Sequence, residues 1–280
     1  MDVGALIEQH QERLTPAERR VAAVVLDHPQ LVAFGTVAEL ARKASTSGAS
    51  VIRLCTKLGF DGFSALQSTV QRDLGRQLRP ATARIRQPES GDLLARGTDV
   101  ELDNVATTLD NVDRTRFELA IQSLANTASR VLVLAGEASR GIGMQIVSDL
   151  SMLRPGVTQV SGSAVRVHRA MADMRPGDTL LLLDLPRYDA WLVEAAQAAL
   201  SRHATVIALS DSVLSPLARR ADLHFVVTAK GNGPFDSYVG ALALIDVLVA
   251  GVADRLRATA TESLDRIEAA WSEAGVLLDE

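Results

Sequence analysis

The stretch "TLLLLDLPRYDA", residues 179–190, indicates the fold of the larger part of the chain. Its four consecutive leucines show no alternation with polar residues, which is typical of a strand covered on both faces in a parallel sheet. The run ends at Asp184, and a polar loop follows. Ligands of open α/β sheets bind beyond the carboxyl ends of the strands, so this loop is a candidate binding loop.

Four more strand-like runs extend the pattern along the chain. They are "RVLVLAG" (130–136), "TQVSG" (158–162), "TVIALSD" (205–211) and "LHFVVTA" (223–229). Helical stretches at 141–153, 163–174, 188–202 and 235–256 alternate with the strands, and helical periodicity also covers 99–129. Strands that alternate with helices predict an α/β domain with helices on both faces of a parallel five-stranded sheet.

The first eighty residues have a helical pattern throughout. Thr15, Pro16 and Glu18 form a capping box with proline at the first helical position. Thr36 and Glu39 repeat the capping-box spacing at the start of a short helix, "VAELARKA". A turn, "STS", and a second helix follow, which are the proportions of a helix-turn-helix.

The second helix of this pair, "GASVIRLCTKLGF", is predicted to be capped by Ser47. In a helix-turn-helix the first residues of this helix enter the major groove of DNA. We predict DNA contacts from Ser47, Ala49, Ser50, Arg53 and Lys57. Small polar residues permit close approach, and Arg53 could reach a guanine edge or a phosphate. Any small three-helix domain can pack two capped helices in this way, so the spacing alone leaves DNA binding open.

Two residues near this helix depart from a simple pattern. Ser45 stands in the turn where glycine is usual, which predicts slight backbone strain because serine tolerates the left-handed conformation less easily. Cys55, the only cysteine of the chain, is expected to be a small buried apolar residue rather than a nucleophile. A single cysteine also leaves no disulfide framework.

Residues 78–98 lose the helical periodicity and contain two prolines and two glycines, which predicts an exposed linker. We therefore expect a helical domain at 1–77, a linker at 78–98 and an α/β domain at 99–280. The formal net charge of −5 argues against coating of nucleic acid by the whole chain. The first eighty residues nevertheless carry ten Lys/Arg against eight Asp/Glu, so a polyanionic partner is expected there.

The ends and the most apolar segment of the chain indicate its compartment. The N-terminus, "MDVGALIEQHQERL", is acidic and amphipathic, unlike a signal peptide. The longest apolar run, 238–253, is too short to span a bilayer and contains Asp246. We expect a cytoplasmic protein with no membrane association.

The segments "LTPAERRVAAVVLDHP" and "TVAELARKASTSGASVIRLCTKLGFDGFSALQ" closely resemble the N-terminal domain of the RpiR family of bacterial transcription regulators, which respond to phosphosugars. The matching features are the "LTPAE" helix start, the "VAELA" helix, the S-x-A-S-V-x-R opening and the "KLGFDGFSALQ" exit. That family joins this domain through a linker to a SIS (sugar isomerase) domain, which residues 99–256 also resemble. The resemblance implies a homodimer or homotetramer whose affinity for a double-stranded DNA operator is set by a small metabolite. We expect neither a cofactor nor a metal.

The resemblance also supplies candidate ligand-binding residues. Ser139 matches the serine of the first SIS loop, although it could equally cap the following helix. Phosphosugar-binding SIS domains have a serine-x-serine-glycine-x-threonine loop after the third strand. Here those positions read Asp184, Pro186, Arg187 and Asp189. Two carboxylates close together repel a dianion and raise each other's pKa, so a phosphosugar bound in the usual way is not expected.

Arg187 leaves two interpretations of this loop open. Its guanidinium could clamp a ligand carboxylate, with Tyr188 adding aromatic surface, or it could only neutralise Asp184 and Asp189 at a helix start. Ser237, at the start of the last large helix, could also face the pocket. The expected effector is a sugar derivative or a carboxylate metabolite.

Two further functions compete with a ligand-responsive regulator. A sugar-phosphate isomerase of the SIS fold needs a positioned acid–base pair, and the loops contain no convincing His/Glu pair. A helix-turn-helix would also be surplus in such an enzyme. Alternatively, the C-terminal domain is only a dimerisation scaffold, which the altered loop would permit. The five histidines (10, 28, 168, 203 and 224) lack metal-ligand spacing.

Overall fold

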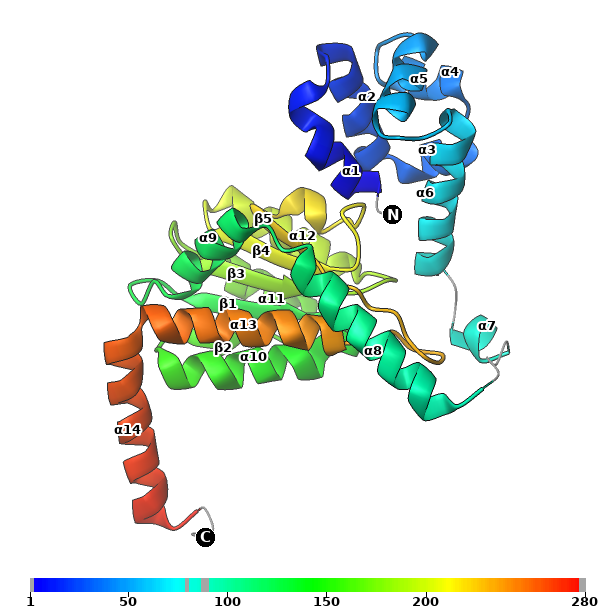
Figure 1. Ribbon diagram of the computed structural model, residues 1–280. Helices are drawn as coiled ribbons and strands as arrows, with labels where there is room; N and C mark the ends of the chain where they lie inside the picture. Colours follow the sequence, from blue (N-terminus) through cyan, green and yellow to red (C-terminus); the bar gives the residue numbers. More distant parts are fainter. Residues whose placement is uncertain (1–2, 79–80, 87–90, 277–280) are drawn as a thin grey trace. The chain divides into compact units, whose positions relative to one another are not determined.

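The computed structural model describes residues 3–78, 81–86 and 91–276 of the chain (Figure 1). The chain forms two compact units, a helical one toward the N-terminus and an α/β one that contains the sheet.

The helical unit contains six α-helices within residues 3–78. They are α1 (Val3–His10), α2 (Pro16–Asp27), α3 (Pro29–Phe34), α4 (Val37–Lys43), α5 (Gly48–Lys57) and α6 (Phe63–Leu78). Apolar residues from all six form one buried cluster, with Val21, Leu40 and Leu54 among its fully buried members. Both predicted capping boxes are present, at Thr15 before α2 and at Thr36 before α4. These local caps begin the helices where the sequence predicted.

The turn between α4 and α5 has the left-handed residue that the sequence predicted. Ser45 has φ 49°, a conformation that glycine adopts more easily. The N–H of Thr46 donates to the carbonyl of Ala41 at 2.9 Å, which closes the end of α4. The Arg20 side chain of α2 donates from Nε to the Ala44 carbonyl at 3.2 Å. The Arg20 side chain therefore stabilises the turn, in which Ser45 has a strained backbone conformation.

The segment predicted as a linker, 78–98, contains more helix than expected. Helix α7 (Ala81–Ile85) lies inside it, and the first residues of α8 (Leu93–Asp110) overlap its predicted end. The Asp92 side chain accepts from the Leu94 N–H at 2.9 Å and caps α8. Leu93 and Leu94 are exposed, so a local cap and not burial of an apolar face begins this helix. Apolar periodicity could not reveal such a start.

The α/β unit contains a parallel five-stranded sheet in the order β2-β1-β3-β4-β5. Its strands are β1 (Val131–Ala135), β2 (Val157–Gln159), β3 (Thr179–Leu183), β4 (Thr205–Ser210) and β5 (Leu223–Val226). This confirms the predicted sheet, although the predicted strand at 158–162 is the shorter β2 at the sheet edge.

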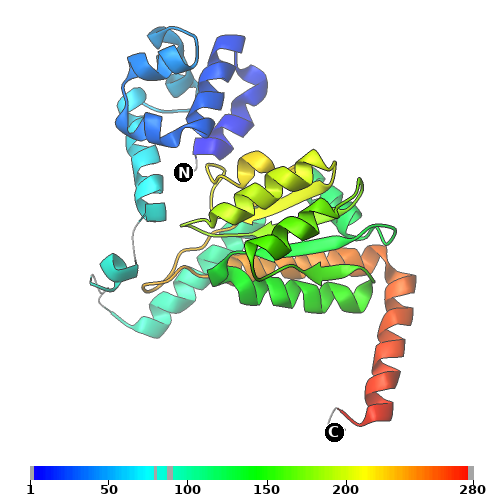
Figure 2. The ribbon, with the colours of Figure 1, turned by 180° about the vertical axis from the view of Figure 1, so that it is seen from behind.

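Helices cover both faces of the sheet, as Figures 1 and 2 show. Helices α9 (Arg114–Leu124), α10 (Arg140–Leu153) and α13 (Val239–Arg255) pack on one face; α11 (Ala164–Ala172) and α12 (Ala190–Ser201) pack on the other. In β3, Leu181 and Leu183 join the first cluster, whereas Leu180 and Leu182 join the second. This two-sided burial explains the unbroken leucine run. The last helix, α14 (Arg257–Ala274), packs against α10 and extends away from the sheet (Figure 2).

Candidate DNA-binding and effector sites

Helix α5 has one buried and one exposed side. Val51, Leu54 and Cys55 are buried, as predicted, and burial raises the pKa of the Cys55 thiol to about 11. The exposed residues are Ala49, Ile52, Arg53, Thr56 and Lys57, with Ser47 just before the helix. Ser50 was predicted to contact DNA, but only 3% of it is exposed.

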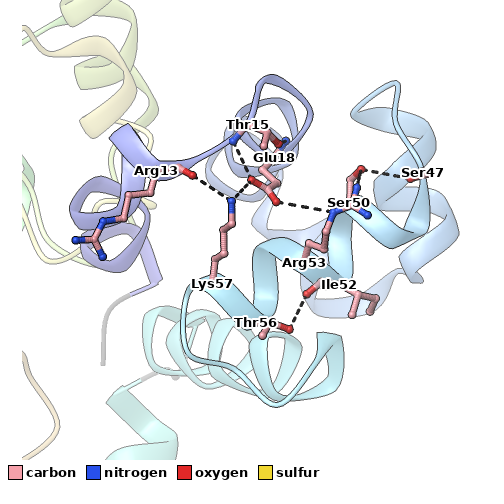
Figure 3. Close-up of polar contacts among 9 residues, drawn as sticks. All are labelled: Arg13, Thr15, Glu18, Ser47, Ser50, Ile52, Arg53, Thr56 and Lys57. Carbon is pink, nitrogen blue, oxygen red and sulfur yellow. Dashed lines mark hydrogen bonds and ion pairs between the residues drawn. The ribbon is translucent and has the colours of Figure 1, made fainter.

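A buried carboxylate, Glu18, organises the charged edge of α5 (Figure 3). Only 1% of its side chain is exposed, and Lys57 Nζ lies 2.7 Å from its Oε2. Lys57 also donates to the Arg13 carbonyl at 3.1 Å. Burial raises the pKa of Glu18, but hydrogen bonds from Lys57 and Thr15 outweigh it, so the pKa lies below its ordinary value. Lys57 therefore neutralises a buried charge in addition to the DNA contact predicted for it.

Arg53 is held through its guanidinium group, although most of its side chain is exposed. Its Nη2 donates to Ser50 Oγ at 2.9 Å, and its Nε lies 3.9 Å from Glu18 Oε1. The side chain is still 60% exposed. Ser50 thus orients Arg53 from inside the unit. The hydroxyls of Ser47 and Ser50 are 3.3 Å apart, and Ser47 makes no side-chain cap bond to the helix, contrary to prediction.

In the α/β unit, two carboxylates occupy the loop after β3. Asp184 is only 6% exposed; its Oδ2 accepts from the Asp189 N–H at 2.7 Å and its Oδ1 from the Leu185 N–H at 3.1 Å. Asp189 Oδ2 accepts from the Glu137 N–H, in the loop after β1, at 2.8 Å. The carboxylates of Asp184 and Asp189 therefore accept hydrogen bonds from backbone N–H groups in the loops that follow β1 and β3, two neighbouring strands.

The burial of Asp184 changes its chemistry. Burial raises the pKa of this carboxyl to about 7, and the nearby charges of Asp189 and Asp211 act in the same direction. Hydrogen bonds from the two loop N–H groups oppose the shift without cancelling it. Asp184 is therefore partly protonated near neutral pH, which reduces the repulsion between the two loop carboxylates.

Arg187 and Tyr188 lie between these aspartates in sequence but have different surroundings. Arg187 is exposed and has φ 76°, the left-handed conformation of a glycine. Within the described ranges it forms no ion pair with Asp184 or Asp189, so the structure gives no support to a neutralising role. The Tyr188 hydroxyl donates to Asp211 Oδ1, after β4, at 2.5 Å.

The two predicted serines have different surroundings. Ser139 is fully buried before α10, and its side chain does not cap that helix. Burial raises the pKa of neighbouring Tyr238, and the Ser139 hydroxyl opposes that shift. Ser237 Oγ donates to Glu101 Oε2 at 2.6 Å, which ties the start of α13 to α8. Ser237 therefore connects α13 to α8. Ser139 lies beside Tyr238, which is also close to Asp184 in the loop after β3.

One polar pair was missed by sequence reasoning. His224 Nε2 of β5 lies 2.7 Å from Ser210 Oγ at the end of β4, and burial lowers the pKa of His224 to about 4. The pair joins two adjacent strands, a contact that sequence spacing does not reveal. Within the described ranges no cluster of His, Cys, Asp and Glu has the geometry to hold a metal ion, and no helix is long and apolar enough to cross a membrane.

Comparison with known families identifies both units. The family model for the helix-turn-helix domain of the rpiR family matches residues 1–77, and the SIS domain model matches residues 124–251. The chain belongs to the rpiR family. This confirms the predicted fold class, a helix-turn-helix domain followed by an α/β SIS domain.

Several known proteins are similar to this rpiR-family chain. The uncharacterized HTH-type transcriptional regulator TTE0211 of Caldanaerobacter subterraneus is 27% identical over 261 residues, 91% of each chain. The sugar isomerase domain of an RpiR transcription factor from Sphaerobacter thermophilus is 27% identical, with a TM-score of 0.58 over 64% of this chain and 99% of that one. The Vibrio vulnificus NanR protein, solved with ManNAc-6P, shares the fold at 21% identity and a TM-score of 0.59, over 99% and 100% of the two chains. This rpiR-family chain is accordingly a DNA-binding transcription regulator of the helix-turn-helix type.

Proposed function

We propose that this regulator binds a double-stranded DNA operator through α5 and that a small metabolite in the SIS domain sets the operator affinity. The helix-turn-helix domain (1–77) would read DNA, and a linker (78–98) would join it to a sensor and dimerisation domain (99–280). The observation that carries the proposal is Arg53, which Ser50 and Glu18 orient while most of its side chain stays exposed. A pre-oriented guanidinium on the second helix of such a motif is suited to a guanine edge or a phosphate.

The five residues predicted to bind DNA then have different roles. Ser47, Ala49 and Arg53 are exposed and contact DNA directly. Ser50 is buried and acts by positioning Arg53. Lys57 is 39% exposed while it neutralises Glu18, so its free surface contributes a phosphate contact.

For the effector, the loop after β3 argues for a group other than phosphate. Asp184 and Asp189 already accept three backbone N–H groups there, and their charge repels a dianion. NanR was solved with ManNAc-6P, a sugar phosphate, but its likeness to this chain supports the shared fold alone. We propose a sugar derivative or a carboxylate metabolite as the effector here, near Ser139, Asp184, Arg187, Tyr188 and Asp189. Ser237 supports the site through Glu101.

Three further features belong to the same proposal. The protein acts without catalysis, as a homodimer or homotetramer, in the cytoplasm where its operator lies. An isomerase of the same fold is disfavoured because the loops contain no convincing His/Glu pair for acid–base catalysis. The remaining alternative is a SIS domain that binds no ligand and serves only as a dimerisation scaffold. The experiment below distinguishes this alternative from a ligand-responsive regulator.

Binding to the DNA upstream of the protein's own gene and its neighbours tests the proposal. We expect sequence-specific affinity that falls steeply between about 50 and 200 mM salt, as phosphate contacts require. Candidate sugars, sugar phosphates and carboxylates are then added at fixed salt. Binding that is not sequence-specific would overturn the regulator role, and binding indifferent to every metabolite would favour the scaffold. Arg53→Ala should relax sequence choice, whereas a phosphate contact alone would weaken all sites alike.

A further inference from the structure

The exposed side of α5 carries an apolar residue that the rest of the helical unit does not use. Ile52 is 41% exposed. Of the large hydrophobic residues of α1 to α6 whose side chains are described, it is the only exposed one. An isolated exposed isoleucine needs no explanation on an ordinary surface. Its place on the second helix of an rpiR-family helix-turn-helix, which faces the major groove, makes it a candidate for base recognition.

The neighbours of Ile52 extend the apolar surface along the helix. With about 3.6 residues per turn, Ala49, Ile52 and Thr56 lie along one side of α5. Both flanking residues are exposed. The Thr56 hydroxyl donates to the Ile52 carbonyl at 3.2 Å, so its hydrogen is used within the helix. Methyl groups are therefore the main chemistry that these three side chains offer to a partner.

The charged residues of α5 lie on a different edge. Figure 3 shows Arg53 and Lys57 directed toward Ser50 and Glu18, while Ile52 points away from that polar cluster. The helix thus presents a methyl-bearing stripe (Ala49, Ile52 and Thr56) beside a cationic edge. The cationic edge suits phosphate oxygens or guanine, but it does not account for the stripe.

We propose that Ile52 recognises a thymine by contact with its 5-methyl group, once in each half-site of the operator. The inference rests on the proposed function and deepens it. In the major groove the thymine methyl is the apolar group that base edges present, and aliphatic side chains contact it. Burying the exposed methyls of Ile52 against it removes apolar surface from water on both partners. Ala49, being small, permits the close approach that this contact needs.

Replacing thymine with deoxyuridine tests the contact, because this change removes only the methyl group. Duplexes are first selected from a random-sequence library with the full-length protein. The selected duplex is then synthesised with deoxyuridine at one thymine position at a time, and dissociation constants are measured for wild type and Ile52→Ala. We expect one position per half-site where deoxyuridine weakens wild-type binding roughly fourfold, the effect of losing one buried methyl-sized group. Ile52→Ala should bind the thymine and deoxyuridine duplexes equally.

Two control variants make the result specific. Ile52→Val keeps a branched side chain and should retain most of the discrimination. Arg53→Ala should bind both duplexes more weakly but keep their ratio, since Arg53 lies on the other edge. Because Ile52 is a surface residue, thermal unfolding of Ile52→Ala should match wild type, which separates loss of contact from loss of fold.

The outcomes distinguish this inference from the proposed function. Wild-type binding that tolerates deoxyuridine at every position would overturn the thymine contact while leaving the regulator role intact. Equal discrimination by Ile52→Ala and wild type would assign the methyl contact to another residue and likewise overturn it. A selection without any sequence preference would overturn both.

Discussion

At the scale of single residues, Arg187 in the loop after β3 has a backbone conformation that its side chain does not suit. The resemblance to phosphosugar-binding SIS domains places glycine at this position, and Arg187 has the left-handed φ of 76° that glycine adopts freely. A side chain in this region costs on the order of 1 kcal/mol. Arg187 therefore has a backbone conformation that suits glycine, the residue that the resemblance places there.

We expect Arg187→Gly to raise the free energy of unfolding by about 0.5–1 kcal/mol, because relief of strain exceeds the extra chain entropy of glycine. Urea denaturation measures this change. His203→Gly is a matched control, since His203 also has a positive φ, 58°, after α12 and outside the loop. If Arg187→Gly is destabilising while His203→Gly is not, the Arg187 side chain stabilises the loop and the strain argument fails.

Asp184 predicts a pH dependence of stability. Its ordinary pKa is 3.8 and burial raises it to about 7, so between these values the folded protein binds a proton that the unfolded chain has lost. The Asp184 contribution is thus fully present below about pH 4, falls as pH rises and is lost above about pH 7. The slope is at most about 1.4 kcal/mol per pH unit.

Asp184→Asn should remove this slope. The free energy of unfolding, measured by denaturation from pH 5 to 8, should fall with pH more steeply in wild type than in the variant below pH 7. The two curves should run parallel above it. Parallel curves over the whole range would mean that the carboxyl ionises with an ordinary pKa in the folded state.

At the scale of elements, the position of α5 depends on an ion pair with α2. Glu18 begins as a local capping residue of α2, since its carboxylate accepts from the Thr15 N–H at 2.8 Å. The same carboxylate binds Lys57 at the end of α5, 39 positions further along the chain. One buried charge therefore both caps one helix and fixes the second helix of the helix-turn-helix against it.

Lys57→Met should lower the free energy of unfolding by about 1–2 kcal/mol. The variant leaves the Glu18 carboxylate buried without its closest cation, and the partial exposure of Lys57 keeps the cost below that of a fully buried pair. Adding Glu18→Gln, which can still cap α2, should recover part of the loss. Denaturation of both single variants and the double variant measures the coupling; additive effects would show that the pair contributes nothing.

At the scale of the whole molecule, the proposed regulator couples two binding events. A metabolite that raises or lowers DNA affinity must have its own affinity changed by DNA to the same extent. A dimer with one α5 per subunit would contact two half-sites about one helical turn, roughly 34 Å, apart. This arrangement makes the spacing of the half-sites as important as their sequence.

Spacing changes in the selected duplex test the two-headed arrangement. Inserting five base pairs between half-sites rotates one of them by about half a turn, and we expect binding to weaken at least tenfold. Inserting ten base pairs returns both half-sites to the same side of the DNA helix, so this duplex is the control for length. Equal affinity for all three duplexes, measured by gel shift, would indicate that each helix-turn-helix binds DNA independently.

The sequence by itself determined the local structure and the family of this protein. Capping boxes at Thr15 and Thr36 act between residues three positions apart, and apolar runs such as that of β3 report burial directly, so helices, strands and sheet class were predictable. The motif residues of α5 followed from the helix-turn-helix pattern, and the altered loop after β3 followed from the resemblance to SIS domains.

Only the tertiary structure decided what those residues do. It buried Ser50 beneath Arg53, joined Lys57 to Glu18, and brought Asp189 to the Glu137 N–H from 52 positions away. It also left Ile52 exposed beside the charged edge of α5. The physical reason is that hydrogen bonds, ion pairs and pKa shifts depend on distances between elements, whereas sequence periodicity reports only which side of its own element a residue occupies.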